Sequence, residues 1–180
     1  MSRTLVLMRH ADAEGWSATG DKGRALSERG HQEATAAAAE LRPLGVQRVL
    51  CSSATRTRET VDTMALGAPV EYMDALYNCG TETLLQRIGE VDDEVEVLLV
   101  VAHAPAIPSL SAELAWASAP QQADALQCHF PTSTFSRFTL EGSWSQLADD
   151  PRVQKDLAEH GSHESAYGDP DDIPGNAPAR

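Results

Sequence analysis

The sequence has few cysteine, aromatic and basic residues for its length. Its 180 residues include three cysteines, at positions 51, 79 and 128, with no Cys-x-x-Cys pair. Neither a disulfide framework nor a cysteine-rich zinc site is therefore expected. Fourteen Lys and Arg residues stand against 27 Asp and Glu, which gives a net charge of −13. This balance argues against general binding to nucleic acid or to anionic membranes, because both need a basic surface.

Long apolar runs are also missing. No stretch approaches the length of a transmembrane helix. The apolar run at residues 5–8 is too short for the core of a signal peptide, and it leads directly into charged residues. We therefore expect a cytoplasmic protein. The length is sufficient for one domain with a full hydrophobic core.

The positive charge is concentrated in the first third of the chain. Nine of the fourteen basic residues precede position 60, whereas residues 149–180 contain eight acidic and three basic residues. This last segment is also polar and rich in Pro and Gly, a composition that does not supply a packed core. We therefore predict a domain over residues 1–148 and an acidic, polar C-terminal tail over residues 149–180.

Predicted strands and helices alternate along the domain. Four apolar runs have the length of buried strands: residues 4–8, 47–51, 70–72 and 96–102. Four segments are predicted to be helical: residues 27–41, 54–65, 81–88 and 105–117. Their expected N-caps are Ser27, Ser52-Ser53 and Thr81. This order predicts an α/β fold with three layers, in which helices cover both faces of a mostly parallel sheet.

The chain is expected to end its domain with a hairpin. Residues 134–140 have the pattern of a strand, with Ser136, Phe138 and Leu140 on one face and Phe135, Arg137 and Thr139 on the other. Glu141-Gly142 then predicts a turn, and residues 144–147 the second arm.

Histidine and arginine residues follow the ends of three predicted strands. Arg9 and His10 come after the first strand, Arg56 lies in the first turn of the helix after the second, and His103 follows the strand at 96–102. In α/β proteins the carboxyl ends of parallel strands form the edge where ligands bind. Helix N-termini favour anions, and the planar guanidinium of Arg matches phosphate oxygens. We therefore predict a site for a phosphoryl group.

Two histidines suit phosphoryl transfer. A neutral imidazole can attack phosphorus as a nucleophile, and neighbouring arginines lower its pKa and keep it unprotonated. A second, protonated imidazole can donate hydrogen bonds to the oxygens that gain charge. A single histidine after a strand is more often structural, but the combination at three strand ends favours a catalytic site.

Four motifs make the sequence resemble the histidine phosphatase, or phosphoglycerate-mutase-like, superfamily. The family's Arg-His-Gly is matched by Arg-His-Ala at 9–11, and its Leu-Ser/Thr-x-x-Gly by residues 26–30. Its Ser-x-x-x-Arg-x-x-x-Thr is matched by residues 52–60, and its Gly-His-x-Pro by Ala-His-Ala-Pro at 102–105. Residues 24–27, Arg-Ala-Leu-Ser, are similar to a segment of the short SixA-type phosphohistidine phosphatases.

The resemblance implies a phosphoglycerate-mutase-like fold and a role for each matched residue. His10 would be the nucleophile that becomes transiently phosphorylated. The phosphoryl oxygens would be held by Arg9, Arg56 and His103, with auxiliary contacts from Arg24 and Ser52. No metal and no other cofactor is expected. Gly is replaced by Ala11 and by Ala102, and either change could alter how closely the backbone approaches the phosphate.

The proton donor is less well defined. Many members of the family take a Glu from the region after the third strand, which corresponds to Glu82, and others an Asp at the position that is Ala104 here. Asp12 and Glu14 are further candidates. A phosphohistidine substrate needs less help from an acid, because its imidazole departs readily.

The segment that carries a cap insertion in larger members is short. Only residues 78–102 separate Tyr77 from His103, so the site is expected to be open enough for a phosphorylated side chain of another protein. We therefore predict a metal-independent phosphatase for phosphohistidine in proteins. The alternative is a phosphatase for small phosphomonoesters, or a mutase, with the same site. Neither nucleic acid nor a membrane is expected as a partner, and the oligomeric state is left open.

Two other classes remain as alternatives. A metal hydrolase could use His10, Asp12 and His103, but arginines would oppose a bound cation, and a chelator would discriminate. A phosphate-binding module without catalysis would bind but not turn over the same substrates.

Overall fold

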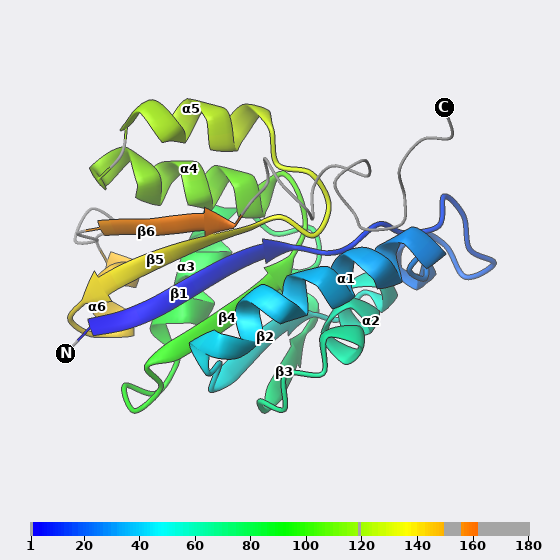
Figure 1. Ribbon diagram of the computed structural model, residues 1–180, viewed down its shortest axis with the longest axis horizontal. Coiled ribbons are helices and arrows are strands. Elements are labelled where there is room, and N and C mark those ends of the chain that lie inside the picture. The colour runs from blue at the N-terminus through cyan, green and yellow to red at the C-terminus, as the bar shows by residue number, and fades with distance from the viewer. Residues whose placement is uncertain (1, 119, 150–155, 162–180) are drawn as a thin grey trace.

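The computed structural model describes residues 2–118, 120–149 and 156–161. Over these residues the chain forms a six-stranded sheet with the order β3-β2-β4-β1-β5-β6. The strands are β1 (Ser2–Arg9), β2 (Arg48–Ser52), β3 (Val70–Met73), β4 (Val97–Ala102), β5 (Phe135–Glu141) and β6 (Asp156–Gly161). The first four run parallel to one another, and β5 is antiparallel to both β1 and β6. The mostly parallel sheet is as predicted (Figure 1).

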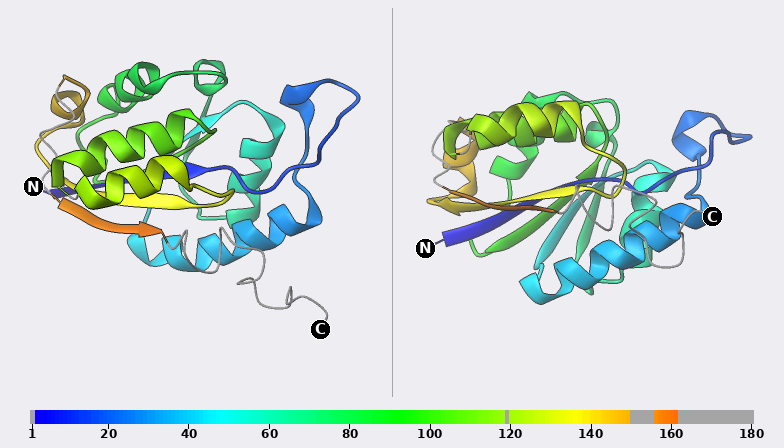
Figure 2. Two further views of the ribbon diagram at one scale, coloured as in Figure 1. Left: turned by 90° about the horizontal axis from the view of Figure 1, so that it is seen from above. Right: turned by 45° about the horizontal axis from the view of Figure 1, so that its top comes forward.

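Helices cover both faces of the sheet, which confirms the three-layer prediction. One face carries α1 (Glu28–Leu41) and α2 (Thr55–Met64). The other carries α3 (Thr81–Gly89), α4 (Ala106–Ser118), α5 (Pro120–Cys128) and α6 (Trp144–Asp149). The two groups lie on opposite sides of the strands in Figures 1 and 2. Short 3₁₀ turns form η1 (Asp21–Gly23), η2 (Arg42–Leu44) and η3 (Asp74–Leu76).

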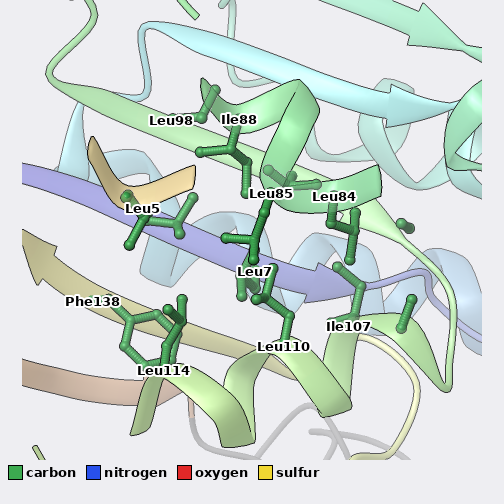
Figure 3. Packing of buried hydrophobic residues seen from close by; sticks show 14 of the residues in the cluster. Leu5, Leu7, Leu84, Leu85, Ile88, Leu98, Ile107, Leu110, Leu114 and Phe138 are labelled. Atoms are coloured by element: carbon green, nitrogen blue, oxygen red, sulfur yellow. The ribbon is translucent and has the colours of Figure 1, made fainter. Parts of the chain in front are cut away.

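The apolar run of β1 is continuous because both of its faces are buried. Leu5 and Leu7 pack into the cluster under α3 and α4, as Figure 3 shows. Val6 and Met8 belong to the second cluster, under α1 and α2. All four side chains are fully buried. Burial on both sides is the usual reason for an unbroken apolar strand in a parallel sheet.

The start of α1 confirms one predicted N-cap, whereas two others are wrong. The Ser27 hydroxyl accepts a hydrogen bond from the Gly30 amide at 3.0 Å. The caps of α2 and α3 are instead Ala54 and Gly80, and neither makes a side-chain capping bond. The serines expected to cap α2 have other partners, described below.

The second arm of the predicted hairpin is also wrong, because residues 144–147 lie in α6. Ser143 and Gln146 form a capping box, in which each side chain bonds the other residue's amide, at 3.2 and 2.9 Å. The helix buries Trp144 completely, and the indole donates to the Val95 carbonyl at 2.8 Å. The Ser-x-x-Gln spacing was a local signal for this helix.

Two further elements were not predicted. Helix α5 follows α4 directly and packs against it. Strand β6 lies within residues 149–180, the segment predicted to be a tail, and it pairs with β5. The remainder of that prediction, over residues 150–155 and 162–180, falls outside the described residues. None of the described helices is long and apolar enough to cross a membrane.

Candidate functional site

The ends of β1, β2 and β4 bring three predicted site residues together. Arg9 is in register with Ala102 across the parallel pair, so His10 and His103 leave the sheet side by side. Their ring centroids are 5.2 Å apart. Arg56, in the first turn of α2, donates from Nε to His10 Nε2 at 3.3 Å. The prediction that these side chains converge at one edge of the sheet is correct.

His10 carries its proton on the nitrogen away from Arg56. Its Nδ1 lies 2.7 Å from the Ala11 carbonyl oxygen, which can only accept, so Nδ1 must donate. Nε2 then keeps a lone pair, directed at Arg56. Burial lowers the pKa of His10 to about 3, with smaller contributions from His103 and Arg56, against the opposing effect of the Ala11 bond. His10 is therefore neutral at physiological pH, mainly because it is buried rather than because arginines are near.

His103 is also neutral in this state. Burial, followed by the charge of Arg56, lowers the pKa of His103 to about 4. Its Nε2 lies 2.7 Å from the Ser52 hydroxyl, and its buried Nδ1 has no hydrogen-bond partner. A phosphoryl anion beside the ring would favour the protonated form that the sequence led us to expect. The structure thus places Ser52 against His103, where it can orient the ring.

Residues 130–134 form hydrogen bonds with Arg9 and His10, and no motif in the sequence indicated these contacts. Arg9 donates to the Phe130 carbonyl at 2.8 Å, and the Arg9 amide to the Thr134 carbonyl at 3.0 Å. The Ser133 amide donates to the His10 carbonyl at 3.0 Å. Ser133 has φ of 63°, which is uncommon for a residue with a side chain. The residue with this uncommon backbone conformation thus bonds directly to the backbone of His10.

Two side chains hold the loop after β1 from the other side. The Thr60 hydroxyl accepts from the Ala11 amide at 3.0 Å and donates to the Arg56 carbonyl at 2.7 Å. The fully buried Glu33 carboxylate accepts from the Asp12 amide at 2.9 Å and from the Thr132 hydroxyl at 3.0 Å. Thr60 is the last residue of the motif at 52–60, so its part in the motif is to tie the loop to α2.

Alanine fits both positions where the family has glycine. The methyl groups of Ala11 and Ala102 are completely buried. Among the described residues, the non-glycine positions with positive φ are 65, 78 and 133, so neither alanine needs a conformation that favours glycine.

Asp21 joins the site although nothing in the sequence singled it out. It lies on η1, and its carboxylate accepts from Arg56 Nη2 at 3.3 Å, from Arg24 Nε at 3.0 Å and from the Tyr77 hydroxyl at 2.6 Å. Arg24 is thus close to the site but is bonded to Asp21. The hydrogen bond from Tyr77, together with Arg24 and Arg56, lowers the pKa of Asp21 to about 2. Asp21 is therefore ionised at neutral pH and holds no proton to donate.

The proposed proton donors have other surroundings than the two histidines. The Asp12 carboxylate accepts from the Ser27 hydroxyl at 2.6 Å, at the start of α1. Glu82 lines a groove between α3 and α6 together with Gly89 and Ser145. Within the described residues, no hydrogen bond or ion pair links Asp12, Glu82 or the Glu14 carboxylate to His10 or His103. The roles proposed for them remain predictions.

Arg58 lies on the other side of α2, as its spacing from Arg56 predicts. Its guanidinium stacks 4.3 Å from the ring centroid of Tyr72, and its Nε donates to the Ser53 carbonyl at 2.9 Å. Within the described part of the chain, no group of three or more His, Cys, Asp or Glu could hold a metal ion.

Comparisons with known proteins agree with this geometry. The histidine phosphatase superfamily (branch 1) matches residues 5–86. An uncharacterized protein of Mycobacterium tuberculosis (strain H37Rv) is 36% identical over 144 residues, which are 78% of this chain and 91% of the relative. SixA from Nakamurella multipartitia has a similar structure, with a TM-score of 0.79 and 36% identity over 90% of this chain and 98% of that one.

A third relative was solved with an oxyanion. The protein histidine phosphatase SixA complexed with tungstate has a TM-score of 0.63 and is 28% identical, over 76% of this chain and 88% of that one. Three observations lead to one conclusion. The four motifs occur in the expected order, and His10 and His103 lie side by side in space at the ends of parallel strands. The relatives are matched over most of their length. The chain belongs to the histidine phosphatase superfamily, in its SixA-type branch.

Proposed function

We propose that this protein is a phosphatase that removes phosphoryl groups from phosphohistidine in proteins, through a phosphorylated intermediate on His10. The observation that carries the proposal is the state of His10. Its Nε2 has a lone pair, and the Arg56 guanidinium is 3.3 Å away. A neutral imidazole beside a guanidinium can attack a phosphoryl group whose oxygens the guanidinium holds.

The reaction proceeds in two transfers. His10 Nε2 attacks phosphorus, the bond between phosphorus and the leaving nitrogen breaks, and the phosphoryl group becomes attached to His10. Water then attacks the phosphorus, so inorganic phosphate forms and Nε2 regains its lone pair. Arg9, Arg56 and His103 stabilise the charge on the phosphoryl oxygens in both steps. Ser52, through its bond to His103, keeps that ring oriented.

The lack of an insertion supports a protein substrate. Only η3 and α3 lie between β3 and β4, and each is short. The two SixA proteins described above are named as a phosphohistidine phosphatase and a protein histidine phosphatase. Their names support the same substrate class here.

The experiment compares two substrates in the presence of a chelator. A phosphohistidine-bearing protein and p-nitrophenyl phosphate are hydrolysed by wild type, by His10→Ala and by Arg58→Ala. We expect wild type to prefer the phosphoprotein and His10→Ala to lose about 10³-fold or more of kcat/KM, as for removal of a nucleophile. Arg58→Ala is the matched control, because Arg58 is on the same helix but contacts Tyr72.

Other outcomes have distinct meanings. Preference for p-nitrophenyl phosphate would move the function to small phosphomonoesters at the same site. Full activity in His10→Ala would show that another group is the nucleophile. Loss of wild-type activity with chelator would favour a metal hydrolase, and phosphate binding without any turnover would favour a binding module.

A further inference from the structure

The Asp21 carboxylate occupies the hydrogen-bonding groups that a phosphoryl group needs. Its Oδ2 accepts from both Arg56 Nη2 and the Tyr77 hydroxyl, and its Oδ1 accepts from Arg24 Nε. The three donors come from the start of α2, the end of η3 and the loop before α1. A negative oxygen held by two guanidinium groups and a hydroxyl is the arrangement expected for a bound phosphoryl oxygen.

Asp21 accepts from both terminal nitrogens of the Arg56 guanidinium. Arg56 Nε points to His10, and Nη1 donates to the Asp21 backbone carbonyl at 2.9 Å while Nη2 donates to its carboxylate. Each of the three guanidinium nitrogens therefore already has an acceptor. Because Arg56 is 6% exposed, it has little room to bind an anion in some other orientation. One N–H group on each Nη has no acceptor among these bonds, so a phosphoryl group on His10 would share the guanidinium with Asp21 and compete with it for the donors that face the site.

We propose that Asp21 is an internal competitor for the phosphoryl group, and that it sets the affinity of the site for anionic substrates and for the phosphate product. The proposal rests on the proposed function, since it concerns the same phosphoryl site. In the structure the single negative charge of the carboxylate offsets part of the positive charge of Arg24 and Arg56. On binding, the incoming phosphoryl oxygens replace it on Arg56 and Tyr77.

The segment that carries Asp21 can move when a ligand binds. Neither η1 nor residues 14–20 contain a buried side chain, and Asp21 itself is 54% exposed. The base of the loop is fixed by the Glu14 amide, which donates to the Ala25 carbonyl at 2.8 Å. Between Glu14 and Ala25, bonds that involve side chains, such as those of Asp21, hold the loop to the rest of the protein. Segments with few buried contacts open at low cost.

This competition has a consequence for specificity. If the site is available in only a fraction of the molecules, the apparent affinity for the ligand is reduced by that fraction. Inorganic phosphate has only its own oxygens with which to displace Asp21, so the product is released easily. A phosphorylated protein adds contacts outside the site and can displace the carboxylate more effectively. Asp21 thus favours large substrates over free phosphate.

An opposite role for Asp21 gives the opposite result. If its carboxylate instead positioned Arg56 for the substrate, removing the charge would weaken phosphate binding and raise KM. Competition predicts tighter phosphate binding and a lower KM. The sign of the change therefore distinguishes the two roles.

The test measures binding of inorganic phosphate by calorimetry at neutral pH, with wild type, Asp21→Asn, Asp21→Ala and Asp74→Asn. Asp74→Asn is the matched control, because this exposed carboxylate bonds Lys22 and Ser53 rather than Arg56. We expect the Kd for phosphate to fall about fivefold in both Asp21 variants, the size of effect usual for a half-exposed ion pair. Asp74→Asn should stay within about twofold of wild type.

Kinetics with the phosphohistidine protein provide a second measurement. We expect both KM and the inhibition constant of phosphate to fall in Asp21→Asn, without a gain in kcat. Unchanged or weaker phosphate binding in both Asp21 variants would overturn the inference, as would the lack of phosphate binding in every protein. If phosphate binding tightens but wild type does not hydrolyse phosphohistidine, the inference stands and the proposed function fails.

Discussion

At the scale of single residues, burial decides the protonation of the site. His10 is 8% exposed and His103 is 9% exposed, so both rings have lost most of the water that would stabilise a charge. Their pKa values, about 3 and about 4, lie well below the ordinary value of 6.5. His10 is therefore unprotonated at neutral pH, which is the state that its proposed role as a nucleophile requires. The same burial lowers the stability of the folded protein when the pH falls.

The stability of the protein should therefore decrease as the pH falls below 6.5. In this range the unfolded chain takes up a proton at His10 and the folded protein does not, which favours unfolding. Lowering the pH from 6.5 to 5 should remove about 2 kcal/mol of stability through His10 alone. Urea unfolding of wild type and His10→Gln at both pH values measures this. The variant should lose less stability than wild type, and equal losses would contradict a depressed pKa.

At the scale of elements, the start of α1 supports the loop that presents His10. The Asp12 carbonyl accepts from the Ser27 amide at 3.0 Å, and the Ser27 hydroxyl donates to the Asp12 carboxylate. A Cβ at Gly30 would lie 2.0 Å from the same carbonyl oxygen. The glycine of the motif at 26–30 therefore allows the helix to approach the backbone two residues beyond His10.

Gly30→Ala should destabilise the protein and impair catalysis together. The new methyl group must push the Asp12 carbonyl away, and we expect a loss of about 3 kcal/mol in urea unfolding, as for severe overpacking. The same displacement should lower kcat by moving His10. Gly15→Ala is the control, because a Cβ there meets nothing within 4 Å and Gly15 does not have a positive φ. Equal behaviour of the two variants would show that the close approach at Gly30 is unimportant.

At the scale of the whole molecule, the site and the far edge of the sheet are separate. His10, Arg56 and His103 follow β1, β2 and β4, whereas β6 lies at the opposite end of the strand order from β3 and beyond β5. Strand β6 pairs with β5 and also lies against α4. Its contribution should therefore be to stability more than to catalysis.

A chain that ends at Asp149 should be less stable than one that ends at Gly161. Removing β6 leaves the β5 edge unpaired, and we expect a loss of about 2 kcal/mol or more in urea unfolding. The two chains should have kcat/KM values for the phosphoprotein within about threefold of each other, because the site residues are retained. A folded short chain without activity would show that β6 contributes to the site.

The sequence determined the elements whose signals are local. Apolar runs of strand length predict β1 to β4, and the Ser27 cap with the alanine-rich segment after it predicts α1, because such patterns depend on residues a few positions apart. The placement of His10, Arg56 and His103 followed as well, since parallel strands end at one edge of the sheet. Helix α6 has a local signal in Ser143 and Gln146, but the turn at Glu141-Gly142 after a predicted strand favours a hairpin over residues 144–147.

The bonds that support the site residues come from contacts between distant parts of the chain. Asp21 meets Arg56 and Tyr77 across 35 and 56 positions of the chain, and Phe130 meets Arg9 across 121. These pairs are set by the paths of loops that are far apart in the sequence and meet only in the folded protein. Burial of His10 likewise depends on all of its neighbours at once. The sequence therefore predicts His10 as the nucleophile, whereas the pKa of His10 and the contacts of Arg56 are properties of the folded protein.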